Sequence, residues 1–109
     1  MEKVTQSLTS VSYEELKEIW QQKSLVITLT YTPICGTCQV AKKMLEVIQT
    51  TLPNLNVFII NLNYYEKMAI DYEIMSVPCL LIHKNEACIE RVYTFESVPF
   101  IYKKITSYF

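Results

Sequence analysis

Glycine is nearly absent from this chain. Its 109 residues include one glycine, Gly36, whereas glycine makes up about 7% of an average protein. Asparagine and proline, which tolerate or preset turn dihedral angles, take its place at expected turns such as Pro53-Asn54 and Lys84-Asn85. The one glycine lies between two cysteines, so that position is the first to inspect for a role other than turn formation.

The sequence also lacks the features of several classes of protein. Its 10 basic and 11 acidic residues give a net charge of −1, and no basic stripe accompanies the eight tyrosines. Nucleic acid and anionic lipid are therefore not expected partners. No apolar run approaches the roughly 18 residues of a membrane helix, and the first residues show no export-signal pattern. We expect a cytoplasmic protein that binds neither nucleic acid nor membrane.

The composition that is present indicates a folded chain. Half of the residues are hydrophobic and 19% are charged, which argues against disorder. The length fits a single domain over residues 1–109. A C-terminal apolar patch of Phe100, Tyr108 and Phe109 gives only weak support for a dimer, and we predict a monomer.

The hydrophobic pattern alternates strands with helices. The β-branched run Leu25–Tyr31 predicts a strand buried on both faces, and Ser12 with Glu15 forms a capping-box pattern at the start of a helix that ends near Lys23. The other expected elements are a strand over Val4–Thr9, a helix over Cys35–Leu52, a strand over Leu55–Leu62, a short helix capped within Asn63–Glu66, strands over Cys79–Ile82 and Cys88–Tyr93, and a helix from Ser97.

This order, βαβαβαββα, predicts an α/β fold with a central sheet flanked by helices. The βαβ half requires parallel strands, and the closing hairpin makes the sheet mixed. The inward-facing residues of the long helix should be Val40, Ala41, Met44, Leu45, Ile48 and Leu52.

Two cysteines lie at the start of that long helix, in the sequence Cys35-Gly36-Thr37-Cys38. Free backbone N–H groups and the helix dipole at this place favour a thiolate at Cys35. Cys38 lies one turn further on, more buried but within reach of the first sulfur. Cys35 can therefore attack a substrate disulfide, and Cys38 can then displace the product from the mixed disulfide. This chemistry predicts a thiol–disulfide oxidoreductase that needs no bound cofactor.

Other interpretations of the cysteines remain open. The pair could supply half of a metal or iron–sulfur site completed by Cys79, Cys88 or His83, although the spacing is not that of two close cysteine pairs. We interpret Cys79 as a small buried hydrophobe, although it follows Pro78 and should lie near the pair. Cys88 is interpreted as an ordinary strand residue. His83 is interpreted as a solvated turn histidine without a catalytic role.

The segment from Tyr31 to Cys38, the long helix after it, and Ser76-Val77-Pro78 about forty residues later resemble the thioredoxin superfamily. The resemblance is to small single-domain bacterial thioredoxin-like proteins and covers nearly the whole chain. It implies the thioredoxin fold, protein disulfides as substrates, and a thiol reductant or reductase as the electron donor. It also implies that Pro78 is a cis-proline facing the cysteines and that the backbone of Val77 binds an extended substrate segment.

The residues around the pair complete the expected contacts with a substrate. Gly36 leaves room for a partner chain, Thr37 places a hydroxyl near the thiolate, and Ile34 stands where the family usually has tryptophan and keeps the contact surface apolar. These three residues join Val77 and Pro78 as the expected substrate-binding set.

The chain also departs from the family pattern. Thr37 replaces the proline that the family usually has between its cysteines. Thr94 replaces a glycine, which should narrow the cleft in which the family binds its substrates. Leu29 and Ile59 stand at the places of a buried acid and its accompanying lysine. Since that acid is thought to handle the proton of the second cysteine, its absence raises an alternative function, a redox-sensing or binding module without rapid turnover.

Overall fold

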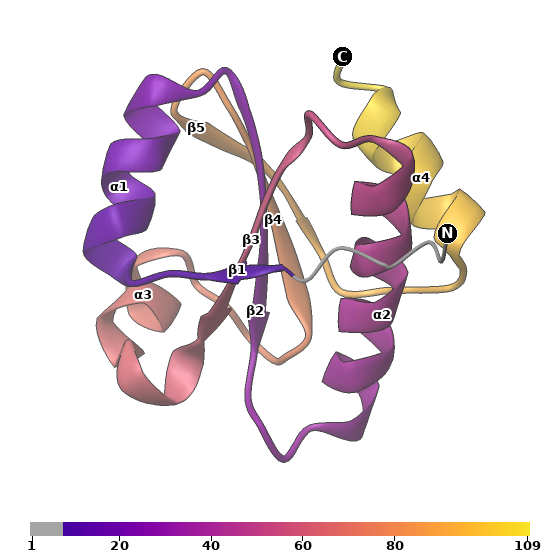
Figure 1. Ribbon diagram of the computed structural model, residues 1–109. Coiled ribbons are helices and arrows are strands. Elements are labelled where there is room, and N and C mark those ends of the chain that lie inside the picture. The colour runs from indigo at the N-terminus through magenta and orange to yellow at the C-terminus, as the bar shows by residue number, and fades with distance from the viewer. Residues whose placement is uncertain (1–7) are drawn as a thin grey trace.

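The computed structural model describes residues 8–109 as a five-stranded mixed sheet with helices on both faces (Figure 1). The strand order is β1-β3-β2-β4-β5. Strands β1 (Thr9–Ser10), β2 (Leu25–Tyr31) and β3 (Asn56–Asn61) run parallel, whereas β4 (Cys79–Lys84) is antiparallel to β2 and β5 (Ala87–Val92) is antiparallel to β4. The predicted mixed sheet is confirmed; of the strand expected over Val4–Thr9, residues 4–7 lie outside the described residues.

The helices cover the two faces of the sheet in pairs. Figure 1 shows α1 (Tyr13–Gln22) and α3 (Glu66–Asp71) on one side and α2 (Gly36–Thr51) and α4 (Val98–Thr106) on the other. No helix within residues 8–109 combines the length and the apolar character needed to cross a membrane.

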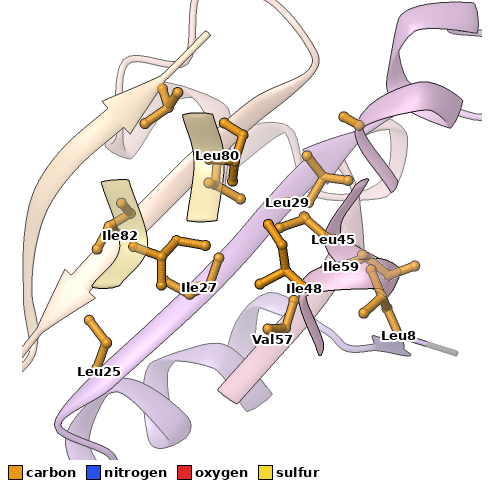
Figure 2. Packing of buried hydrophobic residues seen from close by; sticks show 14 residues of the cluster. Leu8, Leu25, Ile27, Leu29, Leu45, Ile48, Val57, Ile59, Leu80 and Ile82 are labelled. Carbon is orange, nitrogen blue, oxygen red and sulfur yellow. The ribbon is translucent and has the colours of Figure 1, made fainter. Parts of the chain in front are cut away.

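Each face of the sheet closes its own hydrophobic core. The core under α2 and α4 includes Ile27, Leu29, Leu45, Ile48, Leu80, Ile82, Ile101 and Ile105, and Figure 2 shows part of it. The core under α1 and α3 includes Leu16, Trp20, Val26, Ile60, Met68, Cys79 and Leu81. Strands β2 and β4 contribute side chains to both cores, which explains why their sequences are almost continuously apolar.

The predicted helix-start signals are present as hydrogen bonds. Ser12 Oγ accepts a bond from the Glu15 N–H at 3.1 Å, and Glu15 Oε1 accepts one from the Ser12 N–H at 2.7 Å, so the capping box is complete. Ser97 Oγ accepts a bond from the Phe100 N–H at 3.1 Å at the start of α4. These bonds satisfy backbone donors that helices leave free at their first turn.

The hairpin between β4 and β5 turns without glycine. Its two central residues, Asn85 and Glu86, have φ angles of 50° and 77°. Two successive residues with positive φ match the right-handed twist of the flanking strands, and asparagine and glycine tolerate that conformation best. The expected hairpin is confirmed, with Glu86 in a conformation that is unfavourable for a glutamate.

Two local predictions were wrong. The N-cap residue of the short helix is Tyr65, within the expected Asn63–Glu66, but no side chain there forms a capping bond. The chain first forms a 3₁₀ turn over Leu62–Tyr64, in which the Asn63 N–H donates to the Asn61 side-chain oxygen at 3.0 Å. Helix α3 then begins at Glu66 with no side-chain cap. The Asn61 side chain at the end of β3 thus caps the 3₁₀ turn, and no side chain caps α3.

The inward stripe of α2 is also narrower than expected. Ala41, Leu45 and Ile48 are buried, but Val40 is 53% exposed and Met44 is only half-buried. Gln49 takes a buried place because its side-chain amide donates to the backbone oxygens of Leu52 at 3.2 Å and Leu55 at 2.8 Å. Val40 instead faces the hollow described below.

Candidate functional site

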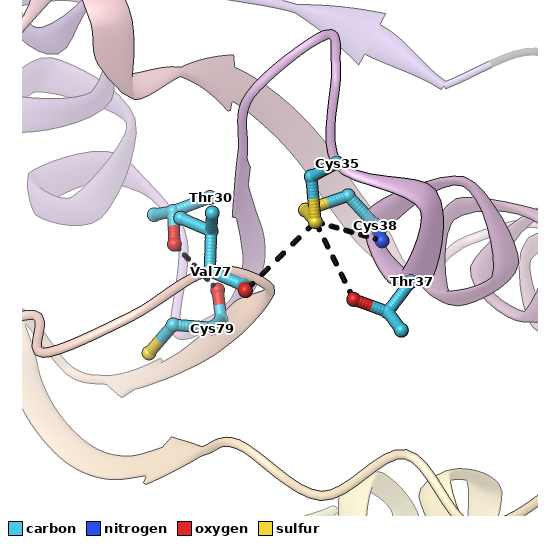
Figure 3. The surroundings of a disulfide bond; sticks show 6 residues. All are labelled: Thr30, Cys35, Thr37, Cys38, Val77 and Cys79. Carbon is cyan, nitrogen blue, oxygen red and sulfur yellow. Dashed lines mark hydrogen bonds between the residues drawn. A yellow bond between two sulfur atoms is a disulfide. The ribbon is translucent and has the colours of Figure 1, made fainter.

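The two cysteines at the start of α2 form a disulfide (Figure 3). Their Cα atoms are 5.2 Å apart. Cys38 is 1% exposed, whereas Cys35 is only half-buried. The outer and inner positions predicted for the two sulfurs are therefore confirmed.

Cys35 is the N-cap residue of α2. Its backbone is extended, and its sulfur accepts a hydrogen bond from the Cys38 N–H at 3.2 Å. The Thr37 hydroxyl oxygen lies 3.4 Å from the same sulfur. When the pair is reduced, these two donors and the helix dipole stabilise negative charge on the outer sulfur.

A second segment faces the cysteines from the other side. The Val77–Pro78 peptide bond is cis, as the family resemblance implied. The Val77 carbonyl oxygen lies 3.9 Å from Cys35 Sγ, although the two residues are 42 positions apart in the chain (Figure 3). The fold thus brings the start of α2 and the start of β4 together around one sulfur.

A hollow of about 500 Å³ adjoins these two segments, and we call it the groove. It is lined by Thr37, Val40, Val77, Pro78, Tyr93, Thr94 and Phe95. Sequence reasoning had placed Val40 in the core and missed Tyr93 and Phe95 as lining residues. In the sequence, only the family resemblance at Thr94 indicated that the segment after β5 lies near the cysteines.

The other expected residues also surround the pair. Ile34 is 96% exposed next to Cys35. At Gly36, a Cβ atom would meet no other atom within 4 Å, so the fold itself does not require glycine there. The surface beside the outer sulfur is therefore apolar and open to an approaching chain.

The positions of the family's buried acid and lysine are apolar here. Leu29 is fully buried and Ile59 is 4% exposed, and they are neighbours across strands β2 and β3. Both belong to the core under α2 and α4. No titratable side chain stands at either position to take the proton of Cys38.

The remaining cysteines do not join the site. Cys79 is fully buried in the core under α1 and α3, and its side chain points away from the disulfide in Figure 3. Burial raises the pKa of Cys79 to about 11 and also raises that of the half-buried Cys88, so both stay protonated thiols at neutral pH. Within residues 8–109, no three histidine, cysteine or acidic side chains gather in a way that could hold a metal ion.

The prediction of a solvated His83 was wrong. Strand β4 continues to Lys84, two residues further than expected, and His83 is 1% exposed within it. Its ring stacks on Trp20 from α1 with a centroid distance of 3.8 Å, and neither ring nitrogen has a hydrogen-bond partner. Burial lowers the pKa of His83 to about 4, so the ring is neutral.

Comparison with known proteins gives the class. The profile of the thioredoxin family matches residues 4–106, and the chain belongs to that family. It is 47% identical over 75 residues to the thioredoxin-like protein YusE of Bacillus subtilis (strain 168), a match that covers 69% of this chain and 71% of that protein.

Solved structures agree on the fold. A thioredoxin of Plasmodium falciparum superposes with a TM-score of 0.84 at 19% identity, over 94% of this chain and all of the other. An N21Q mutant thioredoxin of Halobacterium salinarum NRC-1 gives 0.82 at 22% identity, over 93% of this chain and 88% of the other. The chain is thus a thioredoxin-like protein with the thioredoxin fold and a Cys-x-x-Cys pair at disulfide distance.

Proposed function

We propose that this protein is a thiol–disulfide oxidoreductase that reduces protein disulfides through Cys35 and Cys38. One observation carries the proposal: the half-buried sulfur of Cys35 accepts the Cys38 N–H at the start of α2 and lies 3.9 Å from the Val77 carbonyl oxygen. A thiolate at that sulfur is both stabilised and accessible to a disulfide that approaches along the groove.

The reaction moves two electrons and needs no bound cofactor. The Cys35 thiolate attacks one sulfur of the substrate disulfide, that S–S bond breaks, and the other substrate sulfur leaves as a thiolate. Cys38 then loses its proton to solvent or to the leaving thiolate and attacks Cys35, which releases the second substrate sulfur. The protein is left with the Cys35–Cys38 disulfide that the structure contains. A thiol reductant or a reductase returns the two electrons.

Five residues are assigned to substrate binding. Val77 offers its backbone to an extended segment, and Pro78 holds that backbone facing Cys35. Ile34, Gly36 and Thr37 form the surface on the helix side, where exposure and open space support the assignment. We place this activity in the cytoplasm, in a monomer whose residues 1–109 form one domain.

Substitution of each cysteine tests the proposal. Cys35→Ser should abolish reduction of a model protein disulfide such as insulin, because no nucleophile remains. Cys38→Ser should accumulate mixed disulfides, visible as a mass increase that a reductant removes. Val47→Ser, at an exposed position of α2 that does not line the groove, is the control and should keep full activity. Full activity of the Cys35→Ser protein would falsify the mechanism.

The reduction potential of the pair then gives the direction of electron flow. The protein is equilibrated in graded thiol–disulfide buffers, alkylated, and analysed by mass at each cysteine. A two-electron couple between about −270 and −200 mV supports a reductase, whereas a value near about −120 mV indicates an oxidant and contradicts the reductase proposal.

A redox-sensing or binding module is the second candidate, and the apolar pair Leu29 and Ile59 favours it. Without a buried base, loss of the Cys38 proton depends on solvent or substrate, which slows resolution of the mixed disulfide. The steady-state rate on a protein disulfide with excess chemical reductant separates the two candidates. Rapid cycling supports the enzyme, and slow stoichiometric trapping supports the sensor.

A further inference from the structure

A second hollow, which we call the side hollow, lies next to the groove. It has a volume of about 550 Å³ and shares Tyr93 with the groove. Three apolar side chains on its wall are well exposed: Met75 at 87%, Ile89 at 41% and Tyr93 at 37%. These three exposed apolar side chains lie beside the groove, where a protein bound in the groove can contact them.

A hydrogen bond joins the walls of the two hollows. The Met75 N–H donates to the Tyr93 hydroxyl at 3.1 Å, so the segment that leads to Val77 is tied to the end of β5. Tyr93 therefore fixes the position of the side hollow relative to Cys35. The groove and the side hollow therefore form one continuous surface, and this hydrogen bond holds their walls together.

The charges of the side hollow do not select a charged ligand. Of its two acids, Glu90 is already bound by Lys104 Nζ at 3.1 Å and by the Tyr108 hydroxyl at 3.0 Å. Glu73 and Arg91 then contribute one charge of each sign. The flexible thioether of Met75 adapts to apolar side chains of different shapes. An uncharged apolar side chain can therefore pack against Met75, Ile89 and Tyr93, the apolar part of a wall that is otherwise polar.

The geometry of an extended chain shows which substrate residue would arrive there. A segment paired with the Val77 backbone advances about 3.3 Å per residue, and alternate side chains point to the same face. Met75 lies two residues before Val77 in the chain. A side chain two or three residues along an extended substrate from the cysteine that Cys35 attacks lies about 7–10 Å away from that cysteine, which is the reach needed to pass from the groove into the adjoining hollow.

We propose that the side hollow is a specificity subsite that binds a large apolar side chain of the protein substrate, two or three residues from the attacked cysteine. The proposal rests on the proposed reductase function, because it needs a disulfide substrate in the groove. It makes Ile89 and Met75 determinants of which protein disulfides are reduced.

Disulfide-bonded peptides test this subsite. A peptide series carries leucine, or serine as its counterpart, at each of the positions two and three residues to either side of the attacked cysteine. We expect kcat/KM to be about tenfold higher for leucine at one of these positions, a size typical of one apolar side chain in a pocket. Equal values for leucine and serine at all four positions would overturn the proposal.

Two variants of matched exposure locate the preference. Ile89→Glu places a charge in the side hollow, and Val47→Glu places one on an outer position of α2 with 46% exposure. Ile89→Glu should reduce the leucine preference to less than twofold, while Val47→Glu keeps it. A preference that survives in Ile89→Glu and also in Met75→Glu contradicts the assignment.

A small disulfide separates this proposal from the proposed function. Oxidised glutathione is a small disulfide without a large apolar side chain, so the wild-type protein should reduce it whether or not the side hollow binds leucine. If the wild-type protein reduces neither glutathione disulfide nor any peptide, the reductase function itself has failed. If glutathione disulfide is reduced but peptides show no leucine preference, only the subsite is wrong.

Discussion

His83 shows how strongly its surroundings change one residue. In the sequence it stands near a turn, where a histidine is usually hydrated and titrates close to pH 6.5. In the structure its ring lies between the sheet and α1, against Trp20 and edge-on to Tyr72 at 5.6 Å. Burial without a hydrogen-bond partner holds the ring neutral and lowers its pKa to about 4.

The free energy of unfolding should therefore fall in mild acid. Between pH 6.5 and 4 the unfolded chain binds a proton at His83 that the folded protein excludes, so stability decreases as the pH falls through this window. The difference corresponds to on the order of 3 kcal/mol. Urea unfolding at pH 7, 5.5 and 4 measures it for the wild-type protein and for His83→Phe, which keeps the stacked ring.

Carboxylates titrate in both proteins, so the difference between them isolates the histidine. We expect the wild-type protein to lose stability relative to His83→Phe as the pH falls. Parallel stability curves from pH 7 to pH 4 would show that the folded protein protonates His83 without cost.

Gly36 gives a second prediction at the scale of one residue. Because a Cβ atom there meets nothing within 4 Å, Gly36→Ala should fold normally and gain up to about 1 kcal/mol from helix propensity. If the open space serves an approaching protein, the same variant should raise KM for a protein disulfide and leave the rate with glutathione disulfide unchanged. The exposed position Gln39, as Gln39→Ala, is the control. Unaltered kinetics with both substrates would remove Gly36 from the binding set.

At the scale of elements, the β4–β5 hairpin has a glutamate at a turn position that glycine would fill with less strain. Glu86 adopts a φ of 77°, a conformation that an ordinary side chain disfavours. Glu86→Gly should stabilise the protein by about 0.5–1 kcal/mol, after the larger backbone entropy of glycine is subtracted. Thermal and urea unfolding measure the change. Glu86→Ala, which keeps a Cβ atom, should bring no gain, and an equal gain from both variants would point to removal of the charge instead.

Helices and strands could be predicted from the sequence where the residues that determine them are neighbours in the chain. The capping bonds of Ser12 and Ser97 and the buried run Leu25–Tyr31 involve neighbours in the chain, and the structure contains all three. The pair Cys35 and Cys38 was predictable for the same reason.

The errors arose where a distant segment decides the environment. His83 is buried because Trp20 from α1 covers it, and Val40 is exposed because the segment after β5 forms a hollow there. Met75 and Tyr93 meet across 18 positions of the chain. No spacing rule within one element reports such contacts, since they depend on how the layers are stacked.

At the scale of the whole molecule, the sheet separates two cores that should respond independently. Ile60 belongs to the core under α1 and α3, and Ile105 to the core under α2 and α4. Each Ile→Val substitution should cost about 0.5–1.5 kcal/mol, and the double variant should equal their sum within about 0.5 kcal/mol. Chemical unfolding of the four proteins measures this.

A pair within one core gives the comparison. Ile101 and Ile105 lie one helical turn apart in α4 and share the same core. Their double Ile→Val variant should depart from additivity more than the pair divided by the sheet. Strong coupling between Ile60 and Ile105 would mean that the sheet transmits a packing change from one face to the other.

The reactive sulfur is also part of the scaffold, because Cys35 caps the helix on which Cys38 stands. A thiolate accepts the Cys38 N–H more strongly than a disulfide sulfur does, so reduction tightens the first turn of α2. Amide hydrogen exchange at Cys38 should accordingly be slower in the reduced protein than in the oxidised one. The exchange rate of the Cys38 amide proton should therefore report whether the cysteine pair has gained or lost its two electrons.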